Sequence, residues 1–185
     1  MGKVVLCIDV SGSMAEHDGG GRSRLDLAVL GAHQFVGEAV GANYQVGLIL
    51  WDTGVHQFVP LTADPEPVYR ALRHARIAGG TALAPTLRKG IQVLGELRGD
   101  RVIAVFSDGE IPDGHAAGEA ARDAAVRDIR ILVRGLGPGA AASLDPIATE
   151  GDRAENTVNS SADIAFGIAS MAQRVVRGRA SRAEG

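Results

Sequence analysis

The sequence has a single cysteine and no excess of either charge. Cys7 has no second cysteine with which to form an internal disulfide, and its place in an apolar run favours a small buried side chain over a reactive thiol. The formal net charge is only −3. This balance supplies no basic surface for nucleic acid or for an anionic membrane, so neither partner is expected.

Long hydrophobic runs are also missing. No apolar stretch approaches the roughly 20 residues that span a bilayer. The first apolar strand is expected to begin by the third residue, which leaves no room for the charged and apolar regions of a signal peptide. The sequence therefore predicts a cytoplasmic protein.

A length of 185 residues with 45% hydrophobic residues is sufficient for one packed core. No internal repeat and no linker divides the chain. We expect a single domain over residues 1–178, followed by a frayed tail at 179–185.

Apolar strand patterns alternate with helical patterns along the chain. The run 4–8 has no polar alternation, which is typical of a central strand covered on both faces. Ser23 and Asp26 predict a capped helix start, and Asp52-Thr53-Gly54 predicts a hairpin turn. Further strands are expected at 44–51, 55–61, 101–107, 129–136 and 156–158, and helices at 24–41, 65–75, 85–98, 115–127, 144–149 and from 161 onward. A G-P-G turn is expected at 137–139, and Ile111 is expected to pack inside. The pattern favours an α/β fold: a doubly wound, mostly parallel sheet with one antiparallel edge strand and helices on both faces.

Three separate stretches place oxygen-bearing side chains at the ends of predicted strands or next to glycines. Asp9, Ser11 and Ser13 follow the first strand, Thr81 follows Gly79-Gly80, and Asp108 ends the strand 101–107. In open α/β sheets, ligands bind at the carboxyl ends of the strands. Each residue alone is typical of a turn or a helix cap. Together they indicate one site made of hard oxygen donors.

The segments D-V-S-G-S at 9–13, G-G-T-A-L at 79–83 and F-S-D-G-E at 106–110 resemble the von Willebrand factor type A (vWA) domain with its metal ion-dependent adhesion site. The resemblance covers nearly the whole chain, includes every element of that motif and implies the Rossmann-like vWA fold. It also implies that Ser11, Ser13 and Thr81 offer hydroxyls to a divalent cation, and that Asp9 and Asp108 hold the cation directly or through water.

Oxygen ligands with only two carboxylates favour Mg²⁺, with Mn²⁺ or Ca²⁺ as alternatives. The resemblance implies a protein-protein interaction module rather than an enzyme, in which a partner supplies an Asp or Glu to the metal. It also makes an AAA-type ATPase a plausible partner, because intracellular members of the family often work with such ATPases.

Two other functions stay open. A Mg²⁺-dependent phosphoryl-transfer hydrolase would use Asp9 as its nucleophile, but Ser11 stands where such enzymes usually have a second acid, and the chain has only the lysines Lys3 and Lys89. A structural domain with an empty metal site is the other alternative. The glycine-rich loop 14–22 is either a partner-contacting loop or a solvent loop.

Overall fold

The computed structural model describes residues 1–17 and 20–183. Its strands are β1 (Gly2–Asp9), β2 (Tyr44–Trp51), β3 (Val55–Thr62), β4 (Arg101–Ser107), β5 (Arg130–Leu136) and β6 (Thr157–Val158). Its α-helices are α1 (Arg24–Gly41), α2 (Glu66–Arg73), α3 (Ala84–Leu94), α4 (Gly114–Val126), α5 (Gly137–Leu144), α6 (Arg153–Asn156) and α7 (Ile164–Ala183). Short 3₁₀ helices are η1 (Gly12–Ala15), η2 (Asp145–Ile147) and η3 (Ser161–Asp163).

The strands form one sheet in the order β3-β2-β1-β4-β5-β6. Strand β3 runs antiparallel to β2, and the other neighbouring pairs are parallel. Strand β1 lies between β2 and β4, where Asp9 pairs with Trp51 on one side and Ile8 pairs with Phe106 on the other. Parallel strands end at the same edge of a sheet, so β1 and β4 bring Asp9 and Asp108 to one edge.

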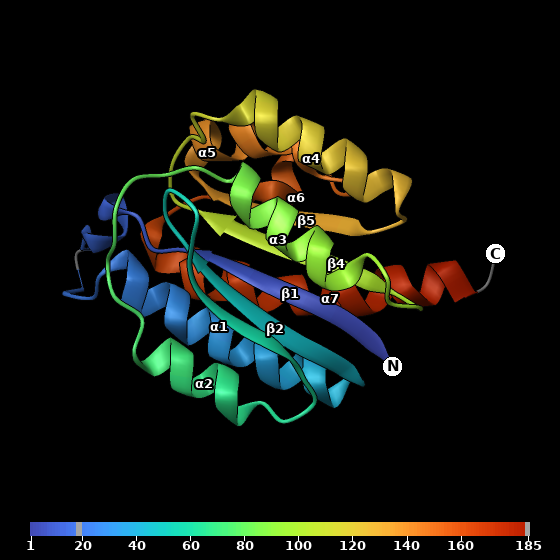
Figure 1. The fold of residues 1–185 in the computed structure, drawn as a ribbon. Coiled ribbons are helices and arrows are strands. Elements are labelled where there is room, and N and C mark those ends of the chain that lie inside the picture. The colour runs from blue at the N-terminus through green and yellow to red at the C-terminus, as the bar shows by residue number, and fades with distance from the viewer. Residues whose placement is uncertain (18–19, 184–185) are drawn as a thin grey trace.

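The core has two layers, one on each face of the sheet. Val4, Leu6 and Ile8 of β1 pack with the apolar faces of α1 and α7, while Val5 and Cys7 pack on the opposite face with α3 and α4. Figure 1 shows this arrangement, with the sheet between the two groups of helices. The predicted fold class is therefore confirmed. Cys7 is buried, and burial raises the pKa of its thiol.

The predicted start of helix α1 is also confirmed. The Ser23 Oγ accepts a hydrogen bond from the Asp26 N–H at 3.0 Å, and Asp26 Oδ2 accepts one from the Ser23 N–H at 2.9 Å. This reciprocal capping box satisfies two backbone donors at the helix start. It therefore fixes the position of Arg24, the first residue of the helix.

Helix α7 returns the end of the chain to the first helix. Its residues Ile164, Ile168, Met171 and Val175 are fully buried, as their spacing predicts. A Cβ at Gly31 of α1 would lie 2.4 Å from the Ala165 carbonyl oxygen, so the two helices approach more closely than any larger residue at Gly31 allows.

Each edge strand of the sheet has a feature that limits the backbone hydrogen bonds it can offer. Strand β3, at one edge, contains the exposed Pro60, which has no backbone N–H. Strand β6, at the other edge, has only the two residues Thr157–Val158.

The prediction of a G-P-G turn followed by a helix is wrong. The G-P-G segment is the first turn of α5, which ends at Leu144, and is not a free turn before a helix at 144–149. Gly137 adopts φ +75°, which glycine tolerates, and Pro138 suits the first turn of a helix. Helix α7 extends to Ala183, and residues 184–185 lie outside the described residues. The fraying of the tail 179–185 stays a prediction.

No helix within residues 1–17 and 20–183 combines the length and the apolar character needed to cross a bilayer.

Candidate metal site at the carboxyl edge of the sheet

Asp9 is a fully buried carboxylate at the end of β1. Its Oδ1 accepts a hydrogen bond from the Ser11 N–H at 2.8 Å, and its Oδ2 accepts one from the Ser107 hydroxyl at 2.8 Å. Both oxygens are therefore fixed by neighbours from two different segments. This arrangement orients the carboxylate rigidly at the edge of the sheet.

Helix η1 brings the two serines toward Asp108. Met14 of this turn is fully buried and anchors it to the core. The Ser11 and Ser13 Oγ atoms lie 3.2 Å apart, and the Ser13 hydroxyl donates to Asp108 Oδ1 at 2.7 Å. The structure thus brings together four of the five predicted residues, Asp9, Ser11, Ser13 and Asp108, in a cluster joined by hydrogen bonds of 2.7 to 3.2 Å.

Thr81, the fifth predicted residue, lies on a loop that packs beside this cluster. The Gly12 N–H donates to the Gly79 carbonyl at 3.1 Å, and the Ala78 N–H donates to the Val10 carbonyl at 2.7 Å. The half-buried Thr81 follows two residues after Gly79. These contacts place its loop against the segment that follows β1.

Asp52, at the end of β2, holds the same loop from the other side. Its Oδ2 accepts from the Gly79 N–H at 3.1 Å and its backbone carbonyl accepts from the Ala82 N–H at 2.7 Å. Burial raises the pKa of Asp52, but the hydrogen bonds from Gly79 and Gly54 and the nearby His56 outweigh burial and leave that pKa lowered. Asp52 therefore stays ionised and clamps the Thr81 loop.

Asp113 fixes the start of α3 directly after Thr81. Its two carboxylate oxygens accept from the Leu83 N–H at 2.9 Å and from the Ala84 N–H at 2.7 Å. A carboxylate at a helix N-terminus satisfies free backbone donors there. The Thr81 loop is thereby held at both of its ends.

Arg24 is a functional candidate that sequence reasoning missed. Its Nη1 donates to Asp108 Oδ2 at 2.9 Å, and its Nη2 pairs with Glu16 Oε2 at 2.5 Å. Its position directly after the helix cap was the available signal, because that helix starts at the edge of the sheet where the site was expected. Ser107 was also missed as a partner of Asp9, although it lies inside the F-S-D-G-E motif.

Burial dominates the electrostatics of Asp9. It raises the pKa of this carboxyl group, against the hydrogen bonds from Ser11 and Ser107, and the negative charge of Asp108 raises that pKa further. Two carboxylates held close together in a buried place are stabilised by a cation. The Arg24 guanidinium supplies a positive charge on the Asp108 side of the cluster.

The donor set fits a hard divalent cation. It consists of carboxylate and hydroxyl oxygens, and in the described part of the chain no group of three or more His, Cys, Asp or Glu gathers as a metal site. Oxygen-only ligands suit Mg²⁺, Mn²⁺ or Ca²⁺, and a small number of carboxylates suits an ion that keeps water.

The loop 14–22 leads from this cluster to α1. His17, inside this loop, forms an antiparallel β-bridge with Ser23, which directly follows it. Residues 18–19 lie outside the described residues. The role of this loop in contacting a partner stays a prediction.

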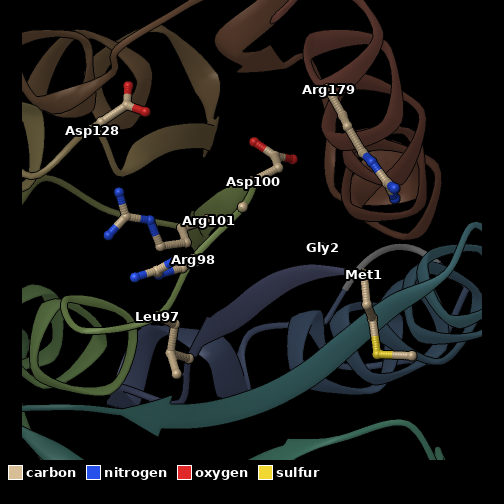
Figure 2. A pocket seen from close by; sticks show the side chains of 9 residues that line it. Met1, Gly2, Leu97, Arg98, Asp100, Arg101, Asp128 and Arg179 are labelled. Carbon is tan, nitrogen blue, oxygen red and sulfur yellow. The ribbon is translucent and has the colours of Figure 1, made fainter. Parts of the chain in front are cut away.

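A pocket of about 550 Å³ lies at the opposite edge, where β1 and β4 begin. Figure 2 shows that Arg98, Arg101 and Arg179 surround it together with Asp100 and Asp128. Asp100 is already paired with Arg130 and with the Tyr44 hydroxyl. Because this pocket contains none of the predicted oxygen ligands, it is not part of the candidate site.

The sequence matches a family model described as the von Willebrand factor type A domain over residues 4–110, which include all five predicted ligands. The chain belongs to the vWA family. No curated protein sequence matches it.

Several solved structures share the fold. The vWF domain of the type V pili tip protein Mfa5 from Porphyromonas gingivalis has a TM-score of 0.79 at 16% identity, covering 96% of this chain and 95% of that one. The conserved hypothetical protein BatB from Bacteroides thetaiotaomicron has a TM-score of 0.73 at 22% identity, covering 96% of this chain and 100% of that one.

The pilus adhesin SpaC from Lactobacillus rhamnosus GG has a TM-score of 0.76 at 15% identity. The match covers 96% of this chain but only 31% of the adhesin. At identities this low the likeness concerns the fold alone.

Proposed function

We propose that this vWA domain is a divalent-metal-dependent protein-protein interaction module. Asp9, Ser11, Ser13, Thr81 and Asp108 would hold the metal, with Mg²⁺ as the expected ion and Mn²⁺ or Ca²⁺ as alternatives. The observation that carries the proposal is the hydrogen-bonded cluster in which Ser13 joins Ser11 to Asp108 and Asp9 is fixed beside them. These groups come from segments far apart in the sequence and converge at one edge of the sheet.

The charge of the site favours an acidic partner. Its two carboxylates balance a divalent ion, and its hydroxyl ligands are neutral, so the bound ion supplies affinity for one more anionic oxygen. Asp9 and Asp108 fix the site, and Arg24 neutralises part of the negative charge at Asp108. A partner's Asp or Glu side chain would provide the additional oxygen.

Asp9 is poorly placed to act as a nucleophile in phosphoryl transfer. The residue is fully buried, and each of its carboxylate oxygens accepts a hydrogen bond at 2.8 Å. An attacking carboxylate must reach the phosphorus atom of its substrate. The fixed, covered position of Asp9 supports the role of a positioned ligand instead.

The nature of the partner is part of the proposal. Two proteins with this fold are described as a pilus adhesin and a pili tip protein. The cytoplasmic location and an AAA-type ATPase partner rest on the sequence and on the family resemblance, and both stay predictions.

The first prediction concerns metal binding. Calorimetric titration of chelator-treated protein with Mg²⁺ and Mn²⁺ is expected to show one site, and Asp108→Ala is expected to lose it because half of the anionic charge of the ligand set is removed. Asp123→Ala, which removes an exposed acid on α4, serves as the matched control and should bind metal as the wild type does. Equal metal binding by both variants would place the ion elsewhere.

The interaction itself requires a second measurement. A partner recovered with the wild type in Mg²⁺ should be released by a chelator and should not be recovered with Asp108→Ala. Substituting the partner's acidic contact residue should have the same effect. Magnesium-dependent turnover of a generic phosphate ester that disappears in Asp9→Asn would instead support the hydrolase alternative.

A further inference from the structure

Strand β5 carries two buried arginines, Arg130 and Arg134, whose surroundings differ. They flank Leu132, which belongs to the core between the sheet and helices α1 and α7, so alternation along the strand directs both toward the same face. Arg130 is 2% exposed and Arg134 is 9% exposed. Each therefore needs partners inside the protein or in a ligand.

Arg130 has such partners. Its Nε and Nη2 donate to Asp100 at 2.9 and 2.8 Å, and its Nη1 donates to Glu150 at 2.9 Å. The Val175 carbonyl also accepts from Nη2 at 2.7 Å. The charge of this guanidinium is fully compensated by two carboxylates.

Arg134 has no comparable compensation. Its Nε and Nη2 make long contacts of 3.3 Å with the Gly167 carbonyl and the Ser170 hydroxyl, both of which are uncharged. Its Nη1 is buried and has no hydrogen-bond partner within residues 1–17 and 20–183. No carboxylate of the described residues lies within ion-pairing distance of its guanidinium.

Other charged side chains near Arg134 act on it in both directions. The pKa of Arg134 is lowered to about 10: burial is the largest cause, the positive charges of Arg174 and Arg177 also lower it, and the negative charge of Glu155 opposes them in part. The neighbouring Glu155 lies 3.9 Å from Arg174, and its side chain is 53% exposed. At neutral pH, Arg134 is therefore a charged, largely buried group that no carboxylate of the described residues contacts directly.

A pocket of about 320 Å³ borders this arginine, between β6 and the first turns of α7. Thr157, Asn159 and Ser170 add polar groups to its lining, and the ring of Phe166, which is 77% exposed, adds an apolar surface. Binding sites for small molecules combine a few polar groups with apolar walls and begin near 300 Å³. This volume suits a small acid or a single acidic side chain.

We propose that the pocket between β6 and α7 binds a carboxylate through Arg134. A guanidinium offers a planar pair of donors that matches the two oxygens of a carboxylate. Glu155 and Asp163 also line the pocket, and their negative charges oppose any anion, but they oppose a doubly charged phosphate more strongly than a singly charged carboxylate. The carboxylate belongs either to a free small acid or to an Asp or Glu side chain of another protein.

The test is a melting experiment carried out in a chelator, so its outcome does not depend on the metal site. Acetate should raise the melting temperature of the wild type by about 4 °C over chloride of equal ionic strength, at a concentration near ten times its dissociation constant. Phosphate should give a smaller rise. A short glutamate peptide blocked at both ends tests the side-chain source: a larger rise with the peptide than with acetate assigns the site to a protein partner, and a smaller one to a free acid.

Three variants test the role of Arg134. Arg134→Met should lose the acetate-dependent rise, and Arg134→Lys, which keeps the charge without the planar pair of donors, should bind acetate about tenfold more weakly. Arg88→Met removes an exposed arginine from α3, on the opposite face of the sheet, and should behave as the wild type. In nuclear magnetic resonance spectra, acetate should shift the amides of Thr157, Gly167 and Ser170. An absent rise in the wild type, an equal rise in Arg134→Met, or a rise with phosphate as large as with acetate would overturn the proposal.

Discussion

Two arginines close together in the sequence, Arg130 on β5 and Arg127 before it, form ion pairs that differ in their exposure to solvent. The Arg130 side chain is 2% exposed, and that of its partner Asp100 is 6% exposed. The Arg127 and Asp123 side chains, which also form an ion pair, are 43% and 50% exposed. The two pairs have similar distances, 2.8 and 2.9 Å, and differ in solvent access.

We predict that Arg130→Met lowers the free energy of unfolding by about 3–5 kcal/mol, because it leaves the buried Asp100 carboxylate with the Tyr44 hydroxyl as its one remaining side-chain partner among the described residues. Arg127→Met should cost no more than about 1 kcal/mol, since water replaces the lost partner of Asp123. Urea unfolding of both variants measures the difference. Similar losses would show that burial does not decide the strength of these pairs.

Single residues also show which contacts of the site can be predicted from the sequence and which cannot. Asp9, Ser11 and Ser13 stand within five residues, so their convergence is local and readable. The pairing of Arg24 with Asp108 joins residues 84 positions apart, so the predicted helix start places Arg24 near the site but does not give its contact with Asp108. The hydrogen bond from Ser107 to Asp9 spans 98 positions and was missed for the same reason.

At the scale of elements, the loop 78–82 matters because it carries Thr81 and has no regular secondary structure of its own. Asp52 and the segment after β1 hold it through backbone hydrogen bonds from Gly79, Ala82, Ala78 and Gly12. The position of one predicted metal ligand therefore depends on a carboxylate outside the ligand set.

We predict that Asp52→Ala lowers the free energy of unfolding by about 1–3 kcal/mol at neutral pH, the usual effect of losing hydrogen bonds to a charged group. The variant should also bind Mg²⁺ more weakly in calorimetry, because the loop with Thr81 is released. Asp64→Ala, which removes an acid that caps α2, is the control and should leave Mg²⁺ binding unchanged.

The contribution of Asp52 should disappear in acid. Because its pKa is lowered in the folded protein, its stabilising effect is fully present above the unfolded-state pKa, near 3.9, and is lost as the pH falls through the folded-state value. Urea unfolding of the wild type and Asp52→Ala should therefore converge at low pH. A constant difference at all pH values would contradict this assignment.

Element by element, the periodic segments were predicted well and the irregular ones were not. The hairpin of β2 and β3 and the capped start of α1 follow from short, strong signals. The start of α5 was misread because Gly-Pro is common both in turns and at the first turn of a helix. Helix α6 has only four residues, Arg153–Asn156, too few to give a period.

At the scale of the whole molecule, helix α1 near the beginning of the chain packs against helix α7 at its end. Gly31 permits this close approach, since a Cβ there would meet the Ala165 carbonyl oxygen at 2.4 Å and the Ala165 Cα at 2.8 Å. Backbone atoms cannot rotate away as the end of a side chain can. The packing of the last helix therefore depends on a missing methyl group.

We predict that Gly31→Ala lowers the free energy of unfolding by about 1–3 kcal/mol through overpacking, despite the better helix propensity of alanine. Gly118→Ala in α4 is the matched control, because its Cβ would have only the end of the Arg122 side chain nearby, at 3.9 Å. That variant should be unchanged or more stable by up to about 1 kcal/mol. The midpoints of denaturant unfolding measure the stability of both variants. Equal effects of the two substitutions would rule out the close contact between the helices.

The two edges of the sheet have a consequence for the behaviour of concentrated protein. An unpaired edge strand offers its backbone groups to a strand of another molecule, and this is a common route to aggregation. Here β3 interrupts its free edge with Pro60, and β6 presents only Thr157–Val158. Neither edge gives an incoming strand a continuous row of donors and acceptors. The sheet should therefore resist the addition of strands from other molecules. Aggregation through β-pairing should be rare even when the protein folds at high concentration.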